Sequence, residues 1–149
     1  MAGPREGDTA PDFELQGTEG PFKLSEHRGE RVVLLFYPAD SSTVCTKQFC
    51  SYRDRAGDVS ALNATVVGIS GQDLESKEKF IADNNLQGVP LLADVGLEVA
   101  KAYGVHQRIL GTKRAVFVID EQGVVRHRHQ NPLSLTFDDV DSLQQALAF

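Results

Sequence analysis

The chain contains two cysteines, Cys45 and Cys50, in the stretch YPADSSTVCTKQFC directly after the apolar run VVLLF. Ser42 and Thr43 can each cap a helix that begins here, because their side-chain oxygens accept hydrogen bonds from free backbone N–H groups. Cys45 then lies in the first turn, where those N–H groups and the positive end of the helix dipole favour a thiolate. Cys45 is therefore the candidate nucleophile.

The spacing of the two thiols restricts what they can do together. On a regular helix Cys50 lies about 140° around the axis from Cys45, with roughly 8.6 Å between their Cα atoms. A disulfide tolerates at most about 6.8 Å between Cα atoms, so the two can bond only if the helix between them unwinds. This spacing fits a reactive Cys45 whose oxidation product is captured by Cys50 after local unfolding. Two unreactive cysteines in a helix are the plain alternative.

Other roles for the cysteine pair fit the sequence less well. A structural disulfide would permanently distort the best-capped turn of the helix. A zinc site needs about four ligands, and no second cysteine pair is present to complete one. The C-x-x-C motif of dithiol reductases is also absent. The histidines lie on other segments of the chain: His27, His106, His127 and His129.

Composition limits the partners and the location of the protein. The 15 basic and 21 acidic residues give a net charge of −6, which argues against nucleic acid or an anionic membrane as the main partner. The opening MAGPREGDTAPDF has no apolar signal region, and no apolar run approaches the roughly 20 residues needed to span a bilayer. We therefore expect a cytoplasmic protein. Without repeats or linkers, residues 1–149 are expected to form one domain.

Strand and helix patterns alternate along the chain. Three short apolar runs without polar alternation are typical of strands buried on both faces, and the segment after the turn DEQG reads as a hairpin partner of the third. The expected strands are 31–37, 64–70, 114–120 and 123–129, with a strand-turn-strand piece in 13–29. The expected helices are 43–62, 73–85 with Asp73 as N-cap, 95–105 and 138–149. This order predicts an α/β protein with a mixed sheet and helices on both of its faces.

The stretch FYPADSSTVC resembles the peroxiredoxin signature Pro-x-x-x-Thr-x-x-Cys. A second cysteine five positions after the first resembles the Q-type subfamily, also called bacterioferritin comigratory proteins. The resemblance extends over GDTAPDFEL, VVGISGQDLESKEKFIADNNL, PLLADVGLEVAKAYGV and KRAVFVIDEQGVV, and so over nearly the whole chain. It implies a thioredoxin-like fold and the reduction of hydrogen peroxide and organic hydroperoxides.

The resemblance also implies roles for single residues. Cys45 would be the peroxidatic cysteine and Cys50 the resolving one, Pro38 would shield the thiolate, and Arg114 would be the active-site arginine. Ser42 would replace the usual threonine, keeping the hydroxyl but losing the methyl group that helps to fix its rotamer. Read without the family, Ser42 can be only a helix cap and Arg114 only a member of a surface ion pair.

The sequence departs from the family pattern at several positions near Cys45. Thr43 and Val44 stand where Q-type members commonly have Pro-Gly, and Gln48 stands where many have Glu.

The resemblance implies that the protein uses no cofactor and that thioredoxin or a similar dithiol is its reductant. Because the chain has no long insertion, a monomer is expected. The alternatives are a redox-controlled binding protein, a one-cysteine peroxiredoxin with an external resolving thiol, and a metal-binding structural domain.

Overall fold

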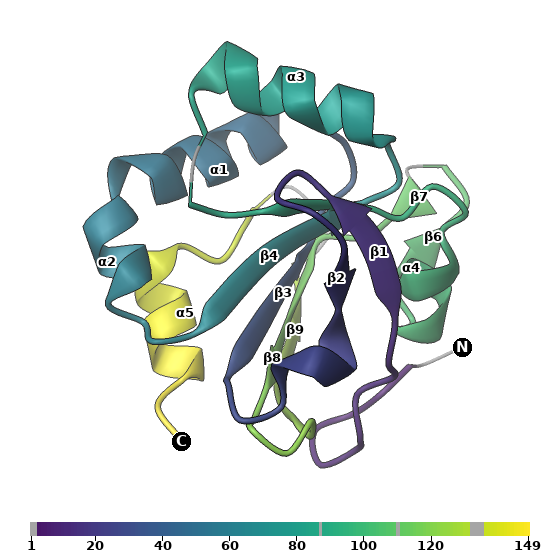
Figure 1. Cartoon of the computed structure of the whole chain (residues 1–149), viewed down its shortest axis with the longest axis vertical. Coiled ribbons are helices and arrows are strands. Elements are labelled where there is room, and N and C mark those ends of the chain that lie inside the picture. Colours follow the sequence, from purple (N-terminus) through teal and green to yellow (C-terminus); the bar gives the residue numbers. More distant parts are fainter. Residues whose placement is uncertain (1–2, 87, 110, 132–135) are drawn as a thin grey trace.

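A mixed β-sheet of seven strands forms the centre of the molecule in the computed structural model, which describes residues 3–86, 88–109, 111–131 and 136–149 (Figure 1). The strand order is β2-β1-β5-β4-β3-β8-β9, and β3, β4 and β5 run parallel to one another. A separate hairpin joins β6 and β7. The strands are Glu14–Gly17 (β1), Phe22–Lys23 (β2), Val32–Phe36 (β3), Thr65–Ser70 (β4), Leu91–Ala93 (β5), His106–Gln107 (β6), Gly111–Thr112 (β7), Ala115–Ile119 (β8) and Val125–Gln130 (β9).

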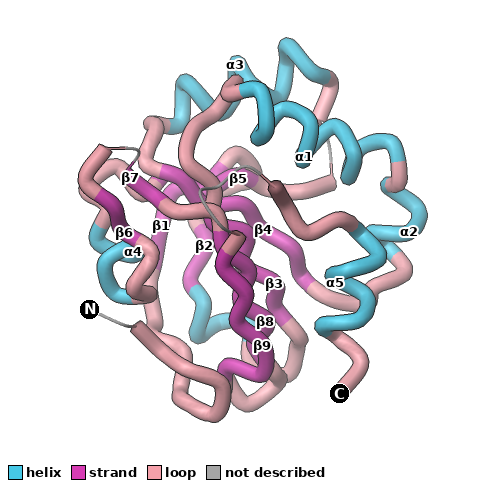
Figure 2. The backbone as a smooth tube through the Cα atoms, turned by 180° about the vertical axis from the view of Figure 1, so that it is seen from behind, coloured by secondary structure: helices cyan, strands magenta, loops and turns pink. Residues whose placement is uncertain are grey.

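Helices cover both faces of this sheet, as the sequence predicted. α1, α3 and α5 lie on one face and α4 on the other (Figures 1 and 2). The α-helices are Thr43–Asp54 (α1), Ala56–Ser60 (α2), Leu74–Asn84 (α3), Glu98–Ala102 (α4) and Val140–Ala146 (α5), and a 3-10 turn spans Leu24–His27. Among the described residues, no helix is both long and apolar enough to cross a bilayer.

The central strand β3 supplies both cores, because successive side chains of a strand point to opposite faces. Val32, Leu34 and Phe36 pack on the α4 side, whereas Val33 and Leu35 pack on the α1 side. All five are buried, which explains why the run lacks polar alternation. The α4 side is closed by neighbouring aromatic rings from distant segments: Phe13, Phe22, Phe36, Tyr103 and Phe117.

The α1 side of the sheet brings the cysteine helix close to the strands. Phe49 of α1 packs its ring against Tyr37, with 4.8 Å between the centroids, and against Phe80 of α3 at 6.0 Å. Gly68 in β4 makes room for that ring, since a Cβ at this position would lie 3.0 Å from the Phe49 Cζ atom. The missing side chain therefore sets how closely α1 approaches the sheet.

Three predicted helices differ from the structure in length, and one of them, expected over 138–149, is observed as Val140–Ala146 with Asp139 as its N-cap. The expected helix 43–62 is divided into α1 and α2 at Arg55, whose backbone leaves the helical region (φ −115°, ψ 37°) while its side chain bonds Asp58 and Asp141. The expected helix 95–105 is shorter because Leu97 adopts a positive φ of 60° immediately before α4. The predicted N-cap Asp73 is confirmed, since its carboxylate accepts a 2.9 Å bond from the Ser76 N–H.

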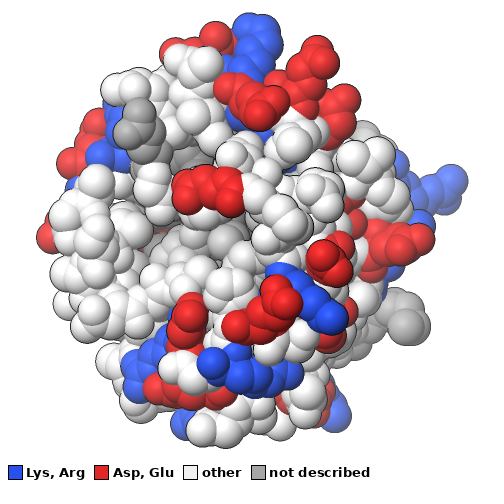
Figure 3. All heavy atoms as spheres, viewed as in Figure 1, with Lys and Arg blue, Asp and Glu red and all other residues white. Residues whose placement is uncertain are grey.

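Charged side chains of both signs share the surface seen in Figure 3. Acidic and basic groups lie next to one another on this face. Ion pairs of the protein include Arg55 with Asp58 and Lys79 with Asp83. Mixed charge of this kind is typical of a solvated surface and does not resemble the continuous basic patch of a nucleic-acid-binding protein.

Candidate active site

Cys45 lies in the first turn of α1, where the chain enters the helix from β3. Ser42 is the N-cap residue, as predicted, and its Oγ accepts a 3.3 Å hydrogen bond from the Cys45 N–H. The Cys45 side chain is buried. Ser41, just before the cap, has a positive φ of 66°, an uncommon conformation for a residue other than glycine. The sulfur therefore lies at the positive end of a helix dipole, at the end of a tightly constrained loop.

Arg114 brings a cation to the sulfur from the other end of the sequence. Antiparallel pairing of β3 with β8 places Phe36 opposite Ala115, so Arg114 lies beside the end of β3 from which the chain continues to Cys45. Its Nη2 atom is 2.8 Å from the Cys45 Sγ, and the guanidinium is buried with the residue 2% exposed. The surface ion pair considered for Arg114 is therefore wrong. A guanidinium stays charged even when buried, so it stabilises an anionic sulfur.

A chain of hydrogen bonds orients Arg114 from behind. The Nη1 atom of Arg114 donates to the Gln48 Oε1, and the Gln48 Nε2 donates to the Tyr52 hydroxyl at 2.9 Å. The Tyr52 hydroxyl in turn donates to the Asp138 carbonyl at 2.6 Å. Burial raises the pKa of Tyr52 well above its ordinary value, so the hydroxyl remains a donor. A neutral Gln48 leaves the charge of Arg114 available to the sulfur.

The remaining predicted residues lie on either side of this centre. Pro38 is buried in the loop between β3 and α1, and its carbonyl accepts a 3.3 Å hydrogen bond from the Gln72 Nε2. Cys50 is half-buried further along α1. Both cysteines are free thiols on an intact helix, so the structure is the reduced state in which the pair cannot bond. Within the described part of the chain, no three His, Cys, Asp or Glu side chains gather as metal ligands would.

The structure thus brings Ser42, Cys45 and Arg114 together through direct contacts. Sequence reasoning missed the positioning of Arg114 by Gln48 and Tyr52. The signal was available: positions 45, 48, 49 and 52 follow helical spacing, so Gln48 and Tyr52 share the inward face of α1 with Cys45. A polar side chain on that face requires a buried partner.

The fold and the site define a class of protein: a mixed sheet with flanking helices that presents a buried cysteine at a capped helix start, in contact with an arginine. Such a sulfur is suited to nucleophilic attack because its anion is stabilised from two directions.

Comparison with known proteins identifies the family. Residues 6–128 match the AhpC/TSA family, and the chain belongs to that family. It is 41% identical over 128 residues to the chloroplastic peroxiredoxin Q of Sedum lineare, covering 84% of this chain and 68% of that protein. It is 39% identical to the chloroplastic peroxiredoxin Q of Triticum aestivum, covering 58% of that protein's length.

A solved structure shows the same relationship. The crystal structure of peroxidoxin BcpB from Mycobacterium tuberculosis superposes with a TM-score of 0.81 and 35% identity, covering 97% of this chain and 95% of that one. The predicted thioredoxin-like fold, the predicted membership of the peroxiredoxins and their Q type, and the predicted class of thiol-dependent peroxidase are confirmed by these findings. The roles of the single residues stay predictions.

Proposed function

We propose that this protein reduces hydrogen peroxide and organic hydroperoxides with Cys45 as the attacking thiolate. The proposal depends above all on the 2.8 Å contact between the Arg114 Nη2 and the Cys45 Sγ at the start of a capped helix. A buried thiol without a cation would be an inert core residue. The confirmed family supports the same reaction.

The chemistry follows from the charges at the site. The Cys45 thiolate attacks one peroxide oxygen, the O–O bond breaks, and the departing oxygen takes a proton to leave as water or an alcohol. Cys45 becomes a sulfenic acid. Negative charge moves onto the departing oxygen in the transition state, and fixed donors directed at it are worth a few kcal/mol in a dry pocket. The Ser42 hydroxyl, the first N–H groups of α1 and the Arg114 guanidinium supply such donors.

Resolution requires α1 to open. The Cys50 thiol attacks the sulfenic sulfur, forming a disulfide and releasing water, and this requires residues 43–50 to leave the helical conformation. A dithiol reductant then returns both thiols, and we assign this role to thioredoxin, with an external resolving thiol as the alternative if Cys50 is not used. A monomeric state and a cytoplasmic location complete the proposal; the plant relatives are named as chloroplastic proteins.

Mass spectrometry after one equivalent of hydrogen peroxide tests the scheme. We expect a Cys45–Cys50 linkage in the natural chain and a sulfenic or sulfinic acid at Cys45 in the Cys50→Ala variant. Cys45→Ser should abolish peroxide consumption, and consumption at the unaltered rate would exclude the proposal. A disulfide that forms without turnover in the presence of reductant would indicate a redox-controlled binding protein instead.

A further inference from the structure

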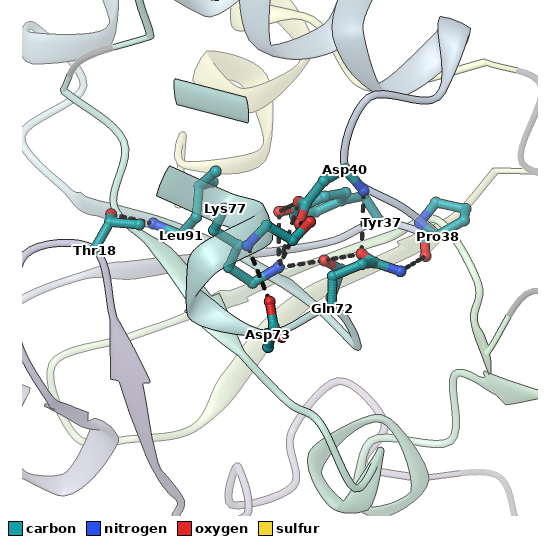
Figure 4. Close-up of polar contacts among 10 residues, drawn as sticks. Thr18, Tyr37, Pro38, Asp40, Gln72, Asp73, Lys77 and Leu91 are labelled. Atoms are coloured by element: carbon teal, nitrogen blue, oxygen red, sulfur yellow. Dashed lines mark hydrogen bonds and ion pairs between the residues drawn. The ribbon is translucent and has the colours of Figure 1, made fainter. Parts of the chain in front are cut away.

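A lysine is buried between α3 and the loop that precedes the cysteine helix. The Lys77 side chain is fully buried, and its Nζ lies 3.4 Å from the Oδ1 of Asp40, whose side chain is 1% exposed. Figure 4 shows Lys77, Asp40 and Tyr37 pointing toward one another at this place. Removing two charges from water is unfavourable unless all their hydrogen-bonding groups find partners.

Every donor of the ammonium group has an acceptor. The Lys77 Nζ donates to the Ser70 Oγ at 2.5 Å, to the Tyr37 hydroxyl at 3.2 Å and to Asp40. Asp40 also accepts from the Tyr37 hydroxyl at 2.6 Å and from the Ser76 Oγ at 2.7 Å. Burial lowers the pKa of Lys77 and raises that of Tyr37 well above its usual value. An ammonium group can only donate and a carboxylate can only accept, so the Tyr37 hydroxyl accepts from Lys77 and donates to Asp40, which fixes the direction of these bonds.

The same network holds the backbone of the loop. The Ser70 Oγ donates to the Gln72 Oε1 at 2.8 Å, and that oxygen also accepts from the Asp40 N–H at 3.1 Å. The Gln72 Nε2 donates to the Pro38 carbonyl at 3.3 Å (Figure 4). The loop residues Pro38 and Asp40 are thus fixed through side-chain and main-chain groups at once.

These bonds end two residues before the helix cap. Asp40 is followed by Ser41, with its positive φ, and by Ser42, whose Oγ bonds the Cys45 N–H. A buried ion pair is weak evidence for stability, because apolar residues of similar volume often serve as well. Its fixed geometry instead suits a part that must be held in one place. Movement of Asp40 would pass directly to the cap and to the sulfur.

We propose that Lys77 is a positioning residue of the peroxidase reaction, which holds the Pro38–Ser42 loop against α3 through Asp40 and Tyr37 and so aligns Cys45 with its hydrogen-bond donors. The inference rests on the proposed function of Cys45. Lys77 acts through the loop and does not touch the sulfur itself. Misplacement of a reacting group by about 1 Å can lower a rate about 100-fold.

The test compares two reactions of the same sulfur in the full chain. Oxidation by hydrogen peroxide needs the aligned donors, whereas alkylation by iodoacetamide needs only that the reagent reach the buried thiolate. In the double variant Lys77→Met with Asp40→Asn, which leaves no unpaired charge buried, we expect oxidation of Cys45 to slow by about tenfold or more. We expect the alkylation rate, read at Cys45 by mass spectrometry, to stay the same or rise, because a loosened loop makes the buried sulfur easier to reach. Lys79→Met with Asp83→Asn is the matched control, since this pair lies on the same helix with the Lys79 side chain 74% exposed.

The rates of Cys45 oxidation and alkylation in the double variant decide whether Lys77 has a positioning role. Oxidation within twofold of the natural rate in a folded double variant would overturn the positioning role, as would an equal loss of both rates. The single variant Lys77→Met should retain less folded protein than the double variant, because it leaves Asp40 buried without a cation. If the natural chain does not consume peroxide at all, the proposed function fails. If the natural chain consumes peroxide and the double variant does so at the same rate, only the inference about Lys77 fails.

Discussion

The two halves of α1 are attached to the molecule by different forces. In the first half, Cys45 and Gln48 face inward and are held by the polar groups of Arg114. In the second half, the Phe49 ring packs edge-on against Tyr37 and Phe80. One half is thus fixed mainly by directed polar contacts and the other mainly by apolar burial.

This difference bears on the proposed opening of α1. A hydrogen bond adds about 1 kcal/mol of net stability because water replaces it on opening, whereas exposing a large apolar side chain costs about 1.5–3 kcal/mol. The segment 43–50 that is proposed to unwind contains one aromatic ring, that of the buried Phe49, whereas Thr43 and Lys47 are already exposed and Val44 is half-buried. The first turn can therefore open at low cost, and displacing Phe49 accounts for most of the free energy needed to bring Cys50 to Cys45.

Phe49→Ala, in the second half of α1, should have the largest effect on the free energy of unfolding. Loss of a buried phenyl ring should lower the free energy of unfolding by about 3–5 kcal/mol. Urea denaturation measures the loss, and Lys47→Ala, an exposed position in the first half, should change it little. A loss below about 1 kcal/mol would show that Phe49 is not the anchor of α1.

Arg114→Gln removes the guanidinium that contacts Cys45 and Gln48 in the first half of α1. Its main effect should be on the rate at which Cys45 is oxidised. Removing a charged donor from the reacting centre should slow oxidation of Cys45 by about 10²- to 10³-fold. Stopped-flow measurement with hydrogen peroxide gives this rate, and Arg5→Gln, whose side chain is 83% exposed, should leave it unchanged. If Arg114→Gln reacts as fast as the natural chain, the guanidinium does not take part in catalysis.

Tyr52 lies in the second half of α1 and bonds Gln48 in the first half. Tyr52→Phe should have an intermediate effect on the free energy of unfolding. It removes the hydroxyl that connects Gln48 to the Asp138 carbonyl, which should cost about 1–3 kcal/mol in unfolding free energy. Because Gln48 loses its support, the disulfide should also form faster from the sulfenic acid. Tyr103→Phe, which loses a 2.6 Å bond to the Pro11 carbonyl on the opposite face, is the control. Equal disulfide rates in both variants would contradict a role for Tyr52 in holding the turn closed.

The smallest effect is expected at the far end of the second half. Arg55 bonds Asp141 and thereby lowers the pKa of that carboxyl below its ordinary 3.8. A lowered pKa means that the contribution to stability is present above pH 3.8 and is lost as the pH falls through the folded value. Thermal unfolding of Asp141→Asn should therefore differ slightly from the natural chain at pH 7 and not at pH 2. Added salt should reduce the difference at pH 7, and a difference that survives at pH 2 would point to another cause.

Local patterns in the sequence predicted much of the fold. The apolar run of β3, the cap residues Ser42 and Asp73 and the place of Cys45 in the first turn depend on neighbouring residues, so the sequence reveals them. The contact between Arg114 and Cys45, which are 69 positions apart, was expected only from the family resemblance. No periodicity in the sequence reports which two strand ends meet.

The buried polar network was missed for a related reason. Lys77 precedes Phe80 by three positions and Ile81 by four, so it falls on the apolar face of α3. A lysine at such a position can extend its stem along the surface and keep its charge in water. Only the structure shows that Asp40 lies opposite and that the charge stays inside. The bond from Arg55, at the break between α1 and α2, to Asp141, 86 positions away, is likewise visible only in the structure.

The meeting of β8 with β3 has a consequence for the newly made chain. Both thiols are synthesised early, but the cation proposed to activate one of them arrives only when a strand from the last third of the protein docks beside the first core strand. In an unfinished or unfolded chain, Cys45 therefore lacks both the guanidinium and the helix start. Under the proposed function, completion of the sheet is what makes the sulfur reactive, so peroxide reduction begins only once the chain has folded.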